Sequence, residues 1–212
     1  MADLELIKKH FSMSTLLTMP IDSMHRSQSS PISPLTAYHK DFPTPGILFC
    51  DILPVLRDPL AFEALLNHLL AHVFTKTIPT LLPSNTGSGK IDAVVGLDAR
   101  GFLFGPILAL RLGAAFVPVR KRGKLPGECV KASFEKEYGT DIFEMQAGAL
   151  EKGANVLVVD DLIATGGSAK AAGELVAQLG AKTVEYVFVV GIPFLKGAEK
   201  LDAPSYAMID MD

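Results

Sequence analysis

Short, almost wholly apolar runs alternate with longer amphipathic runs along the chain from residue 91 onward. Apolar runs of four to eight residues are typical of strands that are buried on both faces of a parallel sheet. Such runs predict strands at residues 91–97, 114–119, 156–159 and 184–190. Between them, residues 102–112 and 168–179 suit helices, and each is followed by a glycine, which commonly ends a helix. The alternation predicts an α/β domain with a mostly parallel central sheet of about five strands, flanked by helices through right-handed crossovers.

An earlier helix is predicted to begin at Pro59. Asp58 is a residue type that accepts hydrogen bonds at a helix start, and proline is favoured at the first helical position. Apolar side chains then recur at helical spacing and form one stripe: Phe62, Leu65, Leu66, Leu69 and Val73. After this helix, residues 79–90 are predicted as a loop, and a later strand-like stretch ends at Tyr138 and Gly139.

The first 37 residues differ in composition and hydrophobic pattern from the rest of the chain. Residues 23–34 are rich in Ser, Pro and Gln and have no period that would bury one face. We therefore expect residues 1–37 to form a flexible N-terminal arm and residues 38–212 to form the domain. The chain has 212 residues, of which 49% are hydrophobic, so this domain can bury a sizeable core.

Composition and charge exclude several classes of function. A formal net charge of -3 disfavours a general nucleic-acid binder, and no apolar run approaches the ~18 residues of a membrane span. The two cysteines, Cys50 and Cys129, form no CxxC pair, which disfavours disulfide and zinc sites and favours a reducing compartment. The first residues lack the apolar core of a secretory signal. These features predict a cytoplasmic protein without a nucleic-acid or membrane partner.

The most informative segment is VLVVDDLIATGGSAKAA, at residues 156–172. Its apolar strand runs into Asp160 and Asp161, and a turn at residues 162–167 leads into a helix. In open parallel sheets, ligands bind at the carboxyl ends of strands, which is where this turn lies. Paired acids are suited to accept hydrogen bonds from ribose 2′- and 3′-hydroxyls and to stabilise a sugar carbon that becomes cationic in the transition state.

The turn after the acids predicts a site for a phosphate monoester. Gly166 and Gly167 leave backbone N–H groups open to an anion, and Thr165 and Ser168 add hydroxyl donors. The following helix also directs its positive end at this point. Two carboxylates that merely cap their own turn would not need such a glycine pair after them.

Two other motifs fail on inspection. The run GSGK at residues 87–90 resembles a P-loop, but Ser84 stands at the first glycine position and Ile91 replaces the required Ser or Thr. His68 and His72 lie one helical turn apart, yet Leu69 occupies the Glu position of a HExxH zinc motif. The sequence therefore predicts no metal ligand from the protein.

The segment at 156–172 resembles the signature with which type I phosphoribosyltransferases bind phosphoribosyl pyrophosphate (PRPP). Three further blocks are similar to the adenine-specific branch of that family, and they are FPTPGILFCD with ILPVLRDP at 42–59, GLDARGFLFGP at 96–106, and VRKRGKLPG with EKEYG at 119–139. The resemblance covers about residues 38–210. It implies a type I phosphoribosyltransferase fold with a small hood contributed mainly by residues 38–55. It also implies transfer of the 5-phosphoribosyl group from PRPP to adenine, which gives AMP and pyrophosphate in purine salvage.

The resemblance assigns substrate groups to two loops. The 5′-phosphate is expected at Ala164, Thr165, Gly166, Gly167 and Ser168, and the ribose hydroxyls at Asp160 and Asp161. Asp98, Ala99 and Arg100 are expected to form a pyrophosphate loop, for which the family commonly has a cis peptide bond after the Asp. Arg100 suits this role because its planar guanidinium can bind two oxygens at once.

The resemblance also implies a lid loop at residues 120–139. Its first part carries a cluster of cations, namely Arg120, Lys121, Arg122 and Lys124. The lid is expected to close over PRPP, to place positive charge on the departing pyrophosphate and to exclude water. Glu137 and Tyr138 resemble an acid–aromatic pair of the family, and Glu137 is expected to take the proton from adenine N7 as a catalytic residue. Glu135 remains an alternative for this role.

A hood over the base is implied for residues 42–49. Backbone groups of Ile47, Leu48 and Phe49 are expected to read the acceptor and donor edge of adenine, with Leu48 packed on the purine face. Two features depart from the family. Cys50 stands where many relatives carry Arg, and residues 77–90 are longer than usual.

The resemblance implies Mg²⁺ as a cofactor, bound through the substrate phosphates, and a homodimer as the assembly. Two other functions remain open. One is the same reaction with another base such as hypoxanthine or xanthine, which the blocks at 42–59 and 119–127 disfavour. The other is a non-catalytic PRPP sensor or nucleic-acid-binding regulator on the same fold, which the presence of both Arg100 and Glu137 disfavours.

Overall fold

A computed structural model describes residues 37–40, 48–81, 89–136 and 139–211. The chain divides into two compact units, Met1–Leu69 and Leu70–Asp212. The arm expected at residues 1–37 lies almost wholly outside the described residues. Within the described residues, no helix is long and apolar enough to cross a membrane.

The described part of the first unit starts with an antiparallel strand pair. Strand β1 (Ala37–Lys40) pairs with β2 (Leu48–Asp51), and a 3-10 helix, η2 (Leu53–Arg57), follows. Helix α4 (Pro59–His72) begins in this unit and ends in the next. The helix start is the predicted one, because the Asp58 carboxylate accepts hydrogen bonds from the N–H groups of Leu60 and Ala61 at 3.0 and 3.2 Å.

The predicted stripe on α4 is confirmed with one adjustment. Leu65, Leu66, Leu69 and Val73 are almost completely buried. Phe62, by contrast, is only partly buried, and the neighbouring Ala61 takes the buried position at the first turn. The buried stripe of α4 therefore begins at Ala61 and not at Phe62.

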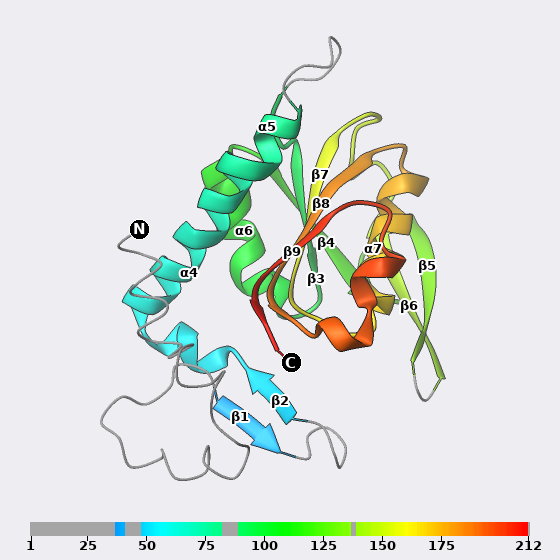
Figure 1. Ribbon diagram of the computed structural model, residues 1–212. Helices are drawn as coiled ribbons and strands as arrows, with labels where there is room; N and C mark the ends of the chain where they lie inside the picture. The colour runs from blue at the N-terminus through cyan, green and yellow to red at the C-terminus, as the bar shows by residue number, and fades with distance from the viewer. Residues whose placement is uncertain (1–36, 41–47, 82–88, 137–138, 212) are drawn as a thin grey trace, which may run out of the picture. The chain divides into compact units, whose positions relative to one another are not determined.

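The second unit contains a seven-stranded sheet in the order β5-β6-β4-β3-β7-β8-β9 (Figure 1). Its strands are β3 (Ala93–Leu97), β4 (Ala115–Lys121), β5 (Cys129–Lys136), β6 (Gly139–Gln146), β7 (Asn155–Ile163), β8 (Lys182–Gly191) and β9 (Ser205–Asp210). Five neighbouring strands, β4, β3, β7, β8 and β9, run parallel. Strands β5 and β6 form an antiparallel hairpin, and β6 pairs with the end of β4. The predicted α/β class and mostly parallel sheet are confirmed.

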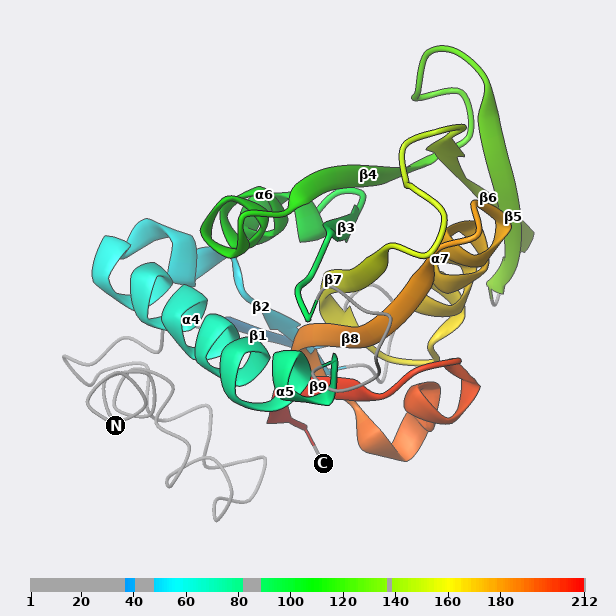
Figure 2. The same cartoon turned by 90° about the horizontal axis from the view of Figure 1, so that it is seen from above.

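Two long helices cover opposite faces of the sheet in the second unit. Helix α6 (Gly101–Leu112) joins β3 to β4, and α7 (Gly167–Gln178) joins β7 to β8. Because β4 and β8 lie on opposite sides of the central β3–β7 pair, two right-handed crossovers place α6 and α7 on opposite faces (Figure 2). The main apolar core lies under α7, where Leu175 and Val176 join Val95, Val158 and Phe188 of the sheet.

The sheet has more strands than the sequence predicts, and one helical segment ends later than predicted. Strands β6 and β9 were missed, since neither is a continuous apolar run, and the sheet therefore has seven strands rather than about five. The loop predicted from Pro79 is wrong at its start. The chain continues from α4 through a π-helical turn, η3 (Val73–Thr77), into α5 (Ile78–Leu81). Pro79 directly follows the π-helical turn, where the regular hydrogen bonding of the α-helix is already interrupted.

The end of α4 and the π-helical turn are held to the sheet by a buried acid. Glu185 of β8 is 8% exposed, and one of its carboxylate oxygens lies 2.9 Å from His72 Nε2. Its other oxygen accepts a hydrogen bond from the Thr77 hydroxyl, and His72 stacks on Tyr206 of β9 with 3.7 Å between ring centroids. A buried carboxylate with these partners fixes where the π-helical turn lies on the sheet.

Candidate active site

The strand order of the sheet changes direction between β3 and β7. In doubly wound sheets, ligands bind at such a switch point, outside the carboxyl ends of the strands. Asp98 follows β3 directly, and Asp160 and Asp161 lie near the end of β7. The pairing of β3 with β7 therefore brings the expected pyrophosphate loop and the paired acids to one edge of the sheet.

The pyrophosphate loop and the acids are joined by an ion pair. The Arg100 Nε lies 2.7 Å from Asp161 Oδ2, and Asp161 is only 4% exposed. The peptide bond between Asp98 and Ala99 is cis, as the family resemblance implied. Arg100 and Asp161, to which the sequence assigned different substrate groups, are thus in direct contact.

A second ion pair connects the end of β4 to the same loop. Arg120 donates from Nε to Asp98 Oδ2 at 3.0 Å and from Nη1 to the Lys124 carbonyl at 3.2 Å. Two arginine–aspartate pairs thus link the ends of the neighbouring strands β4, β3 and β7. This arrangement holds the pyrophosphate loop between two fixed partners.

Burial acts on both acids of β7. It raises the pKa of Asp160 well above that of an ordinary aspartate, and the neighbouring Asp161 carboxylate raises it further. Burial also raises the pKa of Asp161, although the Arg100 guanidinium opposes this shift. The Asp160 carboxylate accepts a hydrogen bond from the Asp161 N–H at 3.0 Å. Perturbed carboxyl groups at a switch point are typical of functional sites.

The expected phosphate loop, Ala164–Ser168, follows β7 and includes the first residues of α7. The strand extends through Ile163, so the turn is shorter than the predicted 162–167, and α7 begins at Gly167. Gly166 has φ 77° and ψ 0°, a left-handed conformation that favours glycine. The N-terminal end of α7 therefore directly follows the turn, as an anion site at a helix start requires.

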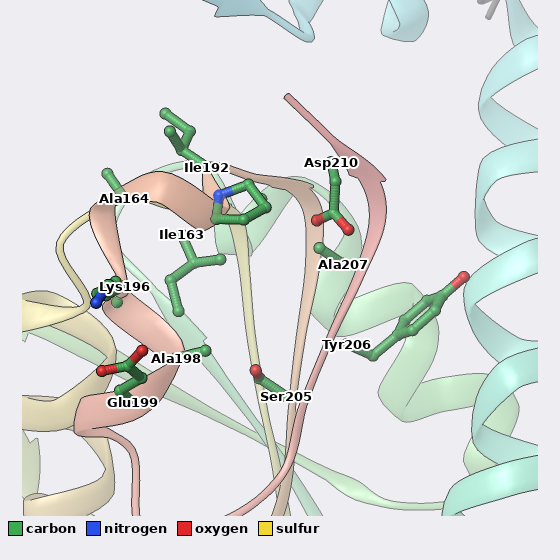
Figure 3. A pocket seen from close by; sticks show the side chains of 13 residues that line it. Ile163, Ala164, Ile192, Lys196, Ala198, Glu199, Ser205, Tyr206, Ala207 and Asp210 are labelled. Atoms are coloured by element: carbon green, nitrogen blue, oxygen red, sulfur yellow. The ribbon is translucent and has the colours of Figure 1, made fainter. Parts of the chain in front are cut away.

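A segment that the sequence analysis did not use lies against the phosphate loop. It comprises η4 (Pro193–Leu195) and η5 (Gly197–Lys200), which follow β8. Together with the end of β7 and with β9 it lines a cavity of about 510 Å³, and Figure 3 shows Ala164 and Lys196 on one side of the cavity and Tyr206 and Asp210 on the other. No motif marks this segment, and only the glycine at 197 could have signalled a close backbone approach.

Part of the expected lid is regular β structure. Arg120 and Lys121 belong to β4, and residues 129–136 form β5, so residues 122–128 are the only described part of the expected lid that is a connecting loop. Gly123 and Gly127 both have left-handed backbone conformations, with φ 78° and 79°. Glu137 and Tyr138 lie outside the described residues.

Within this region, Glu144 of β6 organises the first turn of the lid. It is 5% exposed, accepts a hydrogen bond from the Gly123 N–H at 2.8 Å and lies 3.6 Å from Lys131 Nζ. Lys121 lies 3.7 Å from Asp141. Arg122 is exposed, and its N–H donates to the Ile142 carbonyl at 2.9 Å.

The expected hood residues belong to the first unit. Ile47 lies outside the described residues, and Leu48 and Phe49 are in β2. Cys50, which departs from the family pattern, is 7% exposed. Among the described residues, no group of three or more His, Cys, Asp or Glu side chains is placed to hold a metal ion.

Comparisons with known proteins identify the family of the chain. Residues 67–211 match the family model of the phosphoribosyl transferase domain. The adenine phosphoribosyltransferase of Yarrowia lipolytica is 52% identical over 81% of the chain and 89% of its own length, and that of Rattus norvegicus is 49% identical over 81% and 91%.

Solved structures show the same fold. The Saccharomyces cerevisiae adenine phosphoribosyltransferase, complexed with an imino-altritol bisphosphate and adenine, superposes with a TM-score of 0.76 at 53% identity, over 82% of this chain and 94% of that one. The Trypanosoma brucei enzyme, in complex with AMP, pyrophosphate and ribose-5-phosphate, gives a TM-score of 0.69 at 26% identity, over 85% and 81%. With the family model, the identity and the fold in agreement, the chain belongs to the phosphoribosyltransferase family, in its adenine phosphoribosyltransferase branch.

Proposed function

We infer that the chain catalyses the reaction of this branch, in which adenine and PRPP give AMP and pyrophosphate in purine salvage. The observation that carries the proposal is the meeting of three elements at the β3–β7 switch point. These are the phosphate loop, the half-buried Asp160 with the buried Asp161, and the pyrophosphate loop with Arg100.

Each of these elements has a distinct task in the proposed mechanism. The N–H groups of the phosphate loop, Ala164–Ser168, bind the 5′-phosphate of PRPP at the start of α7. Asp160 and Asp161 accept hydrogen bonds from the ribose hydroxyls, and their negative charge stabilises the cation that develops at C1′. Arg100 and the backbone of Asp98 and Ala99 hold the pyrophosphate, which leaves from one face while adenine N9 attacks the other, with inversion at C1′.

Magnesium is proposed as part of the substrate complex. Mg²⁺ commonly keeps several waters and binds through substrate phosphates, where it neutralises the charge of the pyrophosphate. The carboxylates at the site fit this role, because Asp161 forms an ion pair with Arg100 and Asp98 forms one with Arg120. We therefore assign the ion no ligand from the protein.

The reaction assay with separate bases tests the proposed function. The purified protein is given PRPP, Mg²⁺ and one base at a time, and the nucleotide that forms is quantified. We expect AMP from adenine and no nucleotide from hypoxanthine or xanthine, because these bases reverse the donor and acceptor pattern that the hood residues Ile47, Leu48 and Phe49 are proposed to read. Nucleotide from hypoxanthine would indicate a different base specificity. Nucleotide from none of the bases would favour a PRPP sensor.

The cations Lys121 and Arg122 are proposed to close over the pyrophosphate with Arg120. Replacing both with alanine is expected to lower kcat/KM for PRPP about 10- to 100-fold, because charge-assisted contacts to the leaving group are lost. A double alanine variant of Lys152 and Lys182, exposed near the amino ends of β7 and β8, removes the same charge elsewhere and should keep wild-type kinetics. Equal kinetic constants for both double variants would remove the lid cations from the mechanism.

Glu137 is proposed as the group that takes the N7 proton of adenine, with Tyr138 beside it. Its replacement by glutamine keeps the shape but removes the base, so we expect kcat to fall about 10²-fold while KM for PRPP stays unchanged. The matched variant Glu135→Gln should keep the wild-type rate. If the effects of the two variants are exchanged, Glu135 carries this role instead.

A homodimer and a cytoplasmic location complete the proposal. Light scattering after size exclusion should give twice the 22.7 kDa of one chain. A mass of one chain at micromolar concentration would contradict the dimer.

A further inference from the structure

Two glycines bring the phosphate loop into backbone contact with η5. A Cβ atom on Gly166 would collide with the Gly197 carbonyl, and a Cβ atom on Gly197 would collide with the Ala164 carbonyl. Both contacts involve backbone, which cannot rotate away as a side chain can. The phosphate loop therefore rests on η5, and any shift of η5 is transmitted to the turn that is proposed to bind phosphate.

Beside this contact, one side chain holds a peptide group of the phosphate loop. The ammonium group of Lys200, the last residue of η5, donates to the Thr165 carbonyl at 2.7 Å. The carbonyl of Thr165 and the N–H of Gly166 belong to the same peptide group. In a trans peptide these two groups point in opposite directions, so the bond to Lys200 aims the Gly166 N–H away from Lys200.

The peptide group between Thr165 and Gly166 can adopt two orientations. Gly166 has the φ and ψ of the third residue in a type II turn, 77° and 0°. A type I turn differs from it chiefly by a flip of the central peptide, and glycine is compatible with both. An ammonium group fixed on the Thr165 carbonyl selects one of these two orientations.

Lys200 is itself held in place by a buried anchor. Asp202, two residues after Lys200, accepts a hydrogen bond at 2.6 Å from the hydroxyl of Tyr186, which is fully buried in β8. Gly173 of α7 leaves room for this hydroxyl, since a Cβ atom there would collide with it. The segment after β8 is thus pinned under α7, and the backbone that carries Lys200 is fixed on both sides.

We propose that Lys200 is a positioning residue for the 5′-phosphate: by holding the Thr165 carbonyl, it directs the Gly166 N–H toward the phosphate. The inference rests on the proposed function, because it takes the phosphate loop as the 5′-phosphate site. It assigns Lys200 no contact with the substrate. Its effect should therefore appear in phosphate binding and not in the handling of adenine or pyrophosphate.

Three variants test the inference: Lys200→Met, Lys200→Arg and, as a matched control, Lys182→Met at the exposed start of β8. Calorimetry measures the Kd of AMP and of pyrophosphate, and kinetics give KM for PRPP and for adenine. For Lys200→Met we expect about a 10-fold rise in the Kd of AMP and in KM for PRPP, because the variant loses one charge-assisted hydrogen bond. KM for adenine, the Kd of pyrophosphate and the Tm should stay unchanged. Lys200→Arg should restore most of the AMP affinity.

Two results would overturn the inference while the proposed function stands. One is wild-type AMP affinity in Lys200→Met. The other is an equal weakening of AMP and pyrophosphate, which would indicate a general effect of charge. A wild-type protein that binds no AMP would instead refute the proposed function. Gly197→Ala gives an independent measure, since it displaces the same loop without a change of charge and should weaken AMP binding at least as much as Lys200→Met.

Discussion

Replacing Arg100 with alanine is expected to lower kcat/KM for PRPP by about 10²- to 10³-fold. The guanidinium is proposed to bind the departing pyrophosphate, and the loss of one preorganised donor to a developing charge has an effect of this size. The same change removes the partner of a carboxylate that is 4% exposed, Asp161. Because Arg100 lowers the pKa of Asp161, the loss of Arg100 should raise that pKa further.

Two further variants separate these effects of Arg100. Arg100→Lys keeps a positive charge beside Asp161 but loses the planar fork, so it should recover only part of the lost activity. Arg57→Ala removes an exposed arginine at the end of η2 and should leave the kinetic constants unchanged. Steady-state kinetics with both substrates, together with the Kd of pyrophosphate, provide the measurement. A change of less than twofold in Arg100→Ala would show that the residue does not contact the leaving group.

Local signals in the sequence predict the start of α4 and most of the second unit. The β7 run is so uniformly apolar because Val156, Leu157, Val158 and Val159 are all 0% exposed. The start of α4 was predictable because Asp58 caps it through neighbours in the sequence. Strand β6 was missed for a physical reason. Its polar Asp141 and Glu144 interrupt the apolar pattern, and Glu144 is buried because it binds the lid turn.

The candidate site was predictable in its parts but not in its contacts. The motif at 156–172 predicts the phosphate loop and the paired acids from residue types alone. The Arg100–Asp161 pair depends on which strands are neighbours, and that follows only from the β3–β7 pairing. Lys200 lies in no motif, and its role arises from the path of the chain after β8. Long-range contacts of single side chains leave no periodic signal in the sequence.

Replacing Asp160 with asparagine is expected to lower kcat/KM for PRPP by about 10²-fold, because the ionised carboxylate is proposed to stabilise the cation at C1′. In the folded chain, burial and then Asp161 raise the pKa of Asp160. The active, ionised form therefore appears at higher pH than for an ordinary aspartate. We expect the acid limb of the wild-type profile of kcat/KM against pH to lie correspondingly high, and to be weakened or lost in Asp160→Asn.

The same raised pKa makes an opposite prediction for stability. Between the ordinary aspartate pKa of about 4 and the raised value, the folded chain binds more protons at Asp160 than the unfolded chain does, so the free energy of unfolding falls as pH rises. Asparagine carries no charge and avoids this loss. Asp160→Asn should therefore have a higher Tm than the wild type at pH 8 and no such advantage at pH 4. A functional carboxylate commonly lowers the stability of the fold that holds it. A lower Tm of Asp160→Asn at pH 8, together with lower activity, would therefore mean that Asp160 stabilises the fold and not the transition state.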